Sequence, residues 1–162
     1  RARLLREVGI GLTAHFGGSA AAMIAAAGGS ASALVDIVVR TFPGFRDAVT
    51  DPSDGRQVFL YKRAQIFVGD VWGCFGGRGL GAFGDTVSEL TMFADYRVPV
   101  VLRGLGVLQY TAQLAKAVDG GLETAGAGGV NVPAGSRKEL EIRACTVQAV
   151  ERIKQALVRR LA

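Results

Sequence analysis

The chain has 162 residues, 49% of them hydrophobic, and a formal net charge of +5 at pH 7. This length and apolar content are typical of one compact domain with a buried core, so we expect a single domain over residues 1–162. No run of about 18 or more strongly apolar residues occurs, so a membrane span is not supported. The positive excess lies in residues 136–162, which hold seven Lys or Arg against three Glu.

Cysteine and histidine are scarce in this chain. Cys74 and Cys145 form no Cys-x-x-Cys pair and His15 is the sole histidine, so a Cys/His zinc site cannot be assembled. We expect no metal and no cofactor. This cysteine usage favours a reducing, intracellular location, which we take as the cytoplasm, with the nucleus also open.

The first third of the chain reads as helical. Apolar spacing predicts helices over residues 1–16 and 32–42, and Pro43 ends the second. Residues 44–57 contain the turn-forming sequence Asp-Pro-Ser-Asp-Gly and are expected to form an exposed loop before the next helix. A short strand over 58–61 is the alternative.

The central part of the chain predicts a helix followed by a glycine-rich loop. The helix starts near Lys62 and runs to Trp72, and residues 76–85 then contain five glycines, which cost too much backbone entropy for a helix. Residues 79–84 formally satisfy G-x-G-x-x-G. Because a helix precedes this motif and no βαβ unit follows, we do not interpret it as a dinucleotide site.

The last part of the chain predicts more helices. A helix is predicted over 98–105, with Pro99 in its first turn, where proline is tolerated. A glycine-containing turn over 105–108 then leads to a helix over 111–118. This turn resembles a helix-hairpin-helix.

The C-terminal third contains two contrasting segments. Residues 120–135 are rich in Gly and Ala and are expected to be a flexible insertion. From Arg137 onward, an amphipathic helical stripe is predicted, with its basic side solvated. The stripe consists of Leu140, Ile142, Val147, Val150, Ile153, Leu157 and Leu161.

Two blocks concentrate polar and aromatic groups. Residues 91–97 read Thr-Met-Phe-Ala-Asp-Tyr-Arg just before Pro99, and residues 61–65 read Tyr-Lys-Arg-Ala-Gln. Together with the segments at 41–47, 102–110 and 139–145, which occur in the same order and at about the same spacing, these blocks resemble the queuosine salvage family, the queuosine 5′-phosphate N-glycosylases/hydrolases. The resemblance implies a mainly α, helical DNA-glycosylase-like domain.

The resemblance implies that Asp95 and Lys62 are functional positions. A carboxylate near the ribose stabilises the positive charge that develops at the anomeric carbon when an N-glycosidic bond breaks, which suits Asp95 as a catalytic group. Lys62 supplies a cation for the monophosphate. If residues 91–95 are extended, Thr91, Phe93 and Asp95 point the same way, and Phe93 can stack on the base, so we predict that they line the substrate site.

Other residues near these blocks are candidates for a supporting role. They are Asp70, Trp72, Tyr96 and Arg97. Adjacent helical residues point apart, so Tyr96 and Arg97 cannot face one ligand equally.

Structural alternatives stay open for the same residues. Asp95 can pair with Lys62 or cap the helix at Pro99, Trp72 can belong to the core, Asp70 can bond a loop, and Arg97 can form a surface ion pair.

The expected reaction is hydrolysis of queuosine 5′-phosphate to release queuine, the base needed for tRNA modification. Members of this family are longer, with an N-terminal region and an acidic, aromatic C-terminal segment that contributes to the ligand site, so this chain resembles a central fragment. The alternatives are a helix-hairpin-helix-type nucleic-acid-binding module and an inactive fragment. A small-molecule substrate is expected rather than a membrane or nucleic-acid partner.

Overall fold

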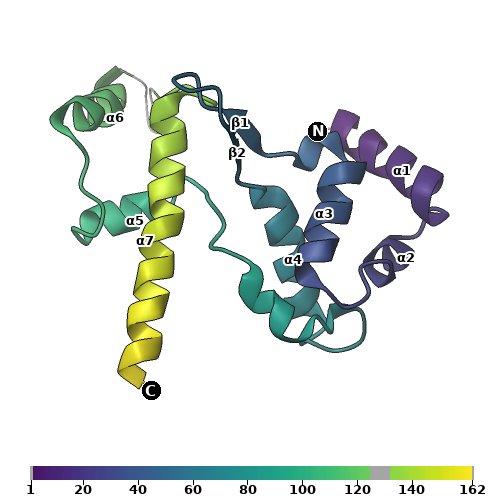
Figure 1. Cartoon of the computed structure of the whole chain (residues 1–162). Helices are drawn as coiled ribbons and strands as arrows, with labels where there is room; N and C mark the ends of the chain where they lie inside the picture. The colour runs from purple at the N-terminus through teal and green to yellow at the C-terminus, as the bar shows by residue number, and fades with distance from the viewer. Residues whose placement is uncertain (1, 125–131, 162) are drawn as a thin grey trace. The chain divides into compact units, whose positions relative to one another are not determined.

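The computed structural model describes residues 2–124 and 132–161, and it is mainly helical (Figure 1). The α-helices are α1 (Ala2–Phe16), α2 (Ala20–Ala25), α3 (Ala31–Thr41), α4 (Lys62–Cys74), α5 (Val98–Gly104), α6 (Ala112–Thr124) and α7 (Arg137–Leu161). Short 3-10 helices are η1 (Pro43–Phe45), η2 (Gly79–Gly81) and η3 (Gly84–Glu89), and strands β1 (Ala48–Thr50) and β2 (Gln57–Phe59) form a two-stranded sheet. The mainly α prediction is confirmed.

The chain divides into two compact units. The first comprises Arg1–Ala48 and Phe59–Phe93, and the second comprises Val49–Val58 and Ala94–Ala162. The single domain over 1–162 stays a prediction, and the two units are described one at a time. No helix in the described residues is both long and apolar enough to cross a membrane.

The first unit is built around α3, which packs against α4 and η3. Ser30 caps α3 by accepting a hydrogen bond from the Ala33 amide, and the Ala31 amide donates to Thr86 Oγ1 of η3 at 2.9 Å. Since β-branched and leucine side chains of α3 recur every three or four residues, one face of the helix is apolar. Its buried residues are Ala31, Leu34, Val35, Val38 and Val39.

The second unit contains α7, which packs against α5. Leu102 of α5 and Leu140 of α7 are both buried. Between α5 and α6 the chain turns at Gly106, which has a φ of 72°, and the amides of Val107 and Leu108 return to the Leu102 carbonyl. Two helices joined by a glycine-containing turn are therefore present, as predicted, and the likeness of this turn to a helix-hairpin-helix stays a prediction.

The structure corrects the expectations for the shorter elements. The predicted loop over 44–57 contains η1, β1 and the start of β2, because the 51–55 turn closes a hairpin: Gly55 has a φ of 73° and its amide donates to the Asp51 carbonyl. Helix α2 was not predicted, since it has only six residues and begins at the Ser19 cap.

Two further expectations concern glycine-rich segments. The predicted insertion over 120–135 includes residues 125–131, which lie outside the described residues, while helix α6 continues through Thr124. The G-x-G-x-x-G motif lies in the η2–η3 region directly after α4, so a helix rather than a strand precedes it, as expected.

Candidate active site

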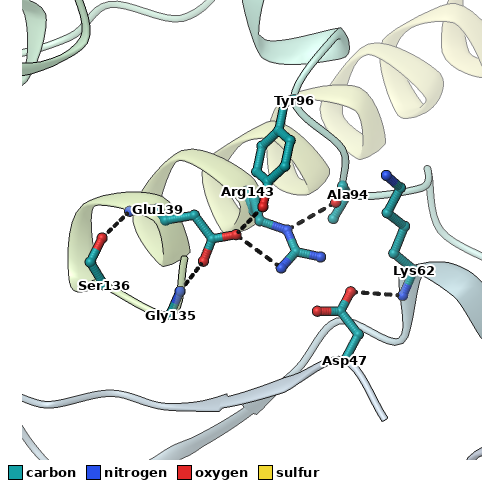
Figure 2. Close-up of polar contacts among 8 residues, drawn as sticks. All are labelled: Asp47, Lys62, Ala94, Tyr96, Gly135, Ser136, Glu139 and Arg143. Atoms are coloured by element: carbon teal, nitrogen blue, oxygen red, sulfur yellow. Dashed lines mark hydrogen bonds and ion pairs between the residues drawn. The ribbon is translucent and has the colours of Figure 1, made fainter. Parts of the chain in front are cut away.

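The start of α4 is fixed by Asp47. Its carbonyl oxygen accepts hydrogen bonds from the amides of Leu60 and Tyr61 at 2.9 and 3.0 Å. Its Oδ2 accepts a hydrogen bond from the Lys62 amide at 3.1 Å, as Figure 2 shows. Tyr61 has a φ of 48°, in the left-handed region that a bulky residue rarely adopts. Three successive amides bound to one residue hold this conformation, and they thereby set where Lys62 enters the helix.

Helix α4 also holds the segment that contains Thr91 and Phe93. Gln65 Oε1 accepts from the Thr91 amide at 2.9 Å, and Gln65 Nε2 lies 3.2 Å from Thr91 Oγ1. The Phe93 ring lies against Gly69, where an added Cβ would be 2.9 Å from the Phe93 Cζ. Lys62, Gln65 and Gly69 share one helical face, so Thr91 and Phe93 both contact the face that begins with Lys62.

Asp70 and Trp72 lie on the two sides of this face. Asp70 is exposed, and the Trp72 side chain is 44% exposed, so Trp72 is not a core residue. The indole instead lies beside Gly77, which has a φ of 69°; a Cβ there would be 3.2 Å from Trp72 Nε1. The contact between Trp72 and Gly77 joins residues close in sequence at the C-terminal end of α4.

Asp95 belongs to the second unit, where its side chain caps the start of α5 from two residues before the N-cap residue, Arg97. Its Oδ1 accepts hydrogen bonds from the amides of Arg97 and Val98 at 2.9 and 3.0 Å. The capping alternative is therefore what the structure shows. Capping uses only one oxygen of the Asp95 carboxylate, Oδ1. Among the described residues, no hydrogen bond to Asp95 Oδ2 is formed, so capping and catalysis are compatible.

The residues on both sides of Asp95 contact a buried ion pair on α7. Arg143 Nη1 lies 3.2 Å from Glu139 Oε1, and both residues are 5% exposed. Arg143 Nε donates to the Ala94 carbonyl at 2.9 Å, and the Tyr96 hydroxyl donates to Glu139 Oε1 at 3.0 Å (Figure 2). Tyr96 is thus anchored at its hydroxyl, although its side chain is 55% exposed.

The structure thus distributes the predicted site residues between the two units. Lys62, Asp70, Trp72, Thr91 and Phe93 lie in the first, whereas Asp95, Tyr96 and Arg97 lie in the second. The catalytic and substrate-binding roles assigned to Lys62, Thr91, Phe93 and Asp95 stay predictions.

Four residues that hold these segments were not among the predicted site residues: Asp47, Gln65, Glu139 and Arg143. Arg143 carried a readable signal, because it follows Leu140 by three residues and precedes Val147 by four, which places it on the apolar stripe. The predicted solvated basic side does not include Arg143, whose charge is buried beside Glu139 on the apolar stripe.

The sequence of this chain is similar to a known protein family and to several of its members. The sequence matches the queuosine salvage protein family over residues 1–162. It is 50% identical to the queuosine 5′-phosphate N-glycosylase/hydrolase of Dictyostelium discoideum over 95% of this chain and 44% of that protein. Proteins of the same name are 50% identical in Sphaerobacter thermophilus (99% of this chain, 46% of the relative) and 39% identical in Mus musculus (98% and 44%).

These matches show that the chain belongs to the queuosine salvage protein family. It spans less than half the length of these curated relatives.

Proposed function

We propose that this chain hydrolyses the N-glycosidic bond of queuosine 5′-phosphate and releases queuine. The observation that carries the proposal is the 50% identity to two proteins named for this reaction, over 95% and 99% of this chain. We further propose that it acts in queuine salvage for tRNA modification, in the cytoplasm or the nucleus.

In the proposed reaction, the bond between the ribose C1′ and the base nitrogen breaks and the base leaves with the bonding electrons. Water adds its oxygen to C1′, and one proton reaches the leaving nitrogen. A 7-deazapurine offers no basic N7 to protonate, so charge stabilisation at the sugar is the main contribution available.

Asp95 is the proposed group for that stabilisation. Two amide hydrogen bonds fix its Oδ1 and hold the carboxylate in one orientation, so its Oδ2 can face the developing charge without reorganisation during the reaction. A group oriented in advance stabilises a transition state more than a mobile surface carboxylate does.

Lys62 is the proposed phosphate ligand, and Thr91 and Phe93 are proposed to line the base site. The Lys62 side chain is half-buried, and its backbone is anchored by Asp47. The Thr91 hydroxyl is engaged with Gln65 and with the Met92 carbonyl, so we assign Thr91 chiefly to holding Phe93 beside α4.

The test is queuine release from queuosine 5′-phosphate, followed by chromatography, with the Sphaerobacter thermophilus relative as the positive control. Asp95→Asn keeps an oxygen that can cap α5 but removes the charge, so we expect kcat to fall about 10²-fold or more while the protein stays folded. Asp95→Ala removes both the capping oxygen and the charge. The matched control is Asp36→Asn, an exposed carboxylate in a surface pair with Arg40, which should keep wild-type kcat.

Two outcomes contradict the proposal. Wild-type kcat in Asp95→Asn removes the carboxylate from the mechanism. No queuine release by this chain, under conditions where the relative is active, shows that the chain by itself is not the hydrolase.

A further inference from the structure

The first two turns of α7 carry a buried pair of opposite charges, Glu139 and Arg143. Glu139 is bonded on both carboxylate oxygens: Oε1 accepts from Arg143 and Tyr96, and Oε2 accepts from the Gly135 amide at 3.0 Å. The Glu139 amide in turn donates to Ser136 Oγ. Hydrogen bonds from Arg143, Tyr96 and Gly135 therefore hold the carboxylate in a single orientation (Figure 2).

A buried ion pair is a poor source of net stability, because the cost of removing both charges from water offsets their attraction. Two apolar side chains could fill the same volume between α7 and its neighbours. They could not make directional hydrogen bonds, and here those bonds reach the carbonyl of Ala94 and the hydroxyl of Tyr96. The pair thus fixes the two residues that flank Asp95.

We infer that Glu139 and Arg143 are positioning residues for Asp95, an inference that rests on the catalytic role proposed above for that carboxylate. Arg143 holds the main chain on the N-terminal side of Asp95, and Glu139 holds the side chain on its C-terminal side. With both neighbours fixed, the amides of Arg97 and Val98 meet Asp95 Oδ1 at one place, and Oδ2 is aimed in one direction.

Arg143→Lys and Tyr96→Phe test this role. Arginine donates to Ala94 and to Glu139 from separate nitrogens, and the single ammonium of lysine cannot reproduce that fork. Tyr96→Phe removes only the hydroxyl from a ring that is 55% exposed, so the variant should fold. The matched control is Glu141→Gln, which breaks the exposed ion pair with Arg137 on the same helix.

For queuine release we expect kcat to fall roughly 10-fold to 10²-fold in Arg143→Lys and about 5-fold in Tyr96→Phe, because small displacements of a catalytic group are costly. KM should change by less than about 3-fold, since a positioning role gives these residues no contact with substrate. Glu141→Gln should match the wild type.

The decisive measurement is kcat for the same two substitutions, Arg143→Lys and Tyr96→Phe, made in an Asp95→Asn background. If the residues act through the Asp95 charge, neither substitution lowers kcat further, because no carboxylate is left to position. A merely structural role predicts that the losses multiply, and that result overturns the inference.

A second measurement is independent of activity. The amides of Arg97 and Val98 stand at the start of a helix, where an amide has no partner within the helix, so their hydrogen exchange reports their bonds to Asp95. We expect exchange at these amides to be about tenfold faster in Arg143→Lys and in Tyr96→Phe, and unchanged in Glu141→Gln. Unchanged exchange in both variants overturns the positioning role. If the wild-type chain releases no queuine, only the proposed function fails, and the exchange result still decides this inference.

Discussion

Two glycines of α4 have different surroundings, and the difference isolates the contact with Phe93. A Cβ at Gly69 would meet the Phe93 Cζ, whereas a Cβ at Gly73 would meet nothing within 4 Å. Alanine in place of helical glycine stabilises by roughly 0.5–1 kcal/mol through backbone entropy. We therefore expect Gly73→Ala to raise the free energy of unfolding by about 0.5 kcal/mol.

Gly69→Ala should gain less than Gly73→Ala, or nothing, because the Phe93 ring has to move away from the helix. If Phe93 stacks on the base, Gly69→Ala should also raise KM for queuosine 5′-phosphate, and Gly73→Ala should not. Urea unfolding and steady-state kinetics of the two variants measure these differences. Equal stability gains and equal KM values would show that the Phe93 position does not matter.

At the scale of single residues, the sequence identified the functional candidates but not what holds them. Lys62 and Asp95 stand in compact, chemically unusual blocks and could be selected by reading along the chain. The bond between Gln65 and Thr91 joins residues 26 apart in sequence, and the bond between Arg143 and Ala94 joins residues 49 apart. No local pattern specifies partners at such separations.

Helices α5 and α6 are joined by a bidentate ion pair. Arg103 Nη1 and Nη2 donate to the two carboxylate oxygens of Asp119 at 2.7 and 2.8 Å, and the guanidinium lies 4.7 Å from the centre of the Tyr110 ring. Hydrogen bonding to Arg103 lowers the pKa of Asp119 below its ordinary value of 3.8, and the same bond raises the pKa of Arg103.

The lowered pKa gives this pair a defined pH dependence. Because the folded-state pKa of Asp119 is below the unfolded one, the pair stabilises the fold above about pH 4, and this contribution is lost as the pH falls through the folded value. The contribution is small, since the carboxylate is solvent-exposed. Carbon NMR titration should show Asp119 titrating below 3.8 in the wild type and nearer 3.8 in Arg103→Gln. Arg56→Gln is the control; an Asp119 pKa at or above 3.8 in the wild type contradicts the prediction.

At the scale of elements, most helices were predictable, whereas α2 and β1 were not expected and β2 was approached only by the alternative strand over 58–61. The helices over α1, α3, α4 and α5 were expected near their observed positions, because apolar spacing and stop signals act within a few residues. Strands β1 and β2 have three residues each, too few for an alternating pattern.

The predicted stripe of α7 shows a further limit of periodicity. Leu140 is buried, but Ile153, Leu157 and Leu161 are 38%, 54% and 87% exposed. An apolar stripe indicates that a helix face can be buried, and only the arrangement of its neighbours decides how much of it is covered.

For the molecule as a whole, positive charge is a weak indication of nucleic-acid binding. The net charge is +5, and most of this positive excess lies on α7, but three basic residues of α7 are paired with carboxylates of the same helix. These pairs are Arg137 with Glu141, Arg143 with Glu139, and Lys154 with Glu151. Side chains that are already paired with carboxylates are less available to bind phosphate groups.

We therefore expect weak, non-specific binding to a short DNA duplex. The slope of the logarithm of the binding constant against the logarithm of salt concentration should correspond to about three phosphate contacts or fewer. Fluorescence anisotropy at several salt concentrations measures this slope, and Arg159→Gln should reduce it by at most about 1. Tight binding with a slope of about six or more would instead favour a nucleic-acid-binding module.

The sequence alone determined the family and the mainly helical fold and selected Lys62 and Asp95 as candidates, because periodicity, helix signals and compact motifs are local properties of the chain. Only the tertiary structure decided that Asp95 uses one oxygen to cap α5, that Asp47 fixes the start of α4, and that Arg143 is buried rather than solvated. These features depend on hydrogen bonds between segments far apart in sequence, and burial of a charge depends on which partner the fold brings to it.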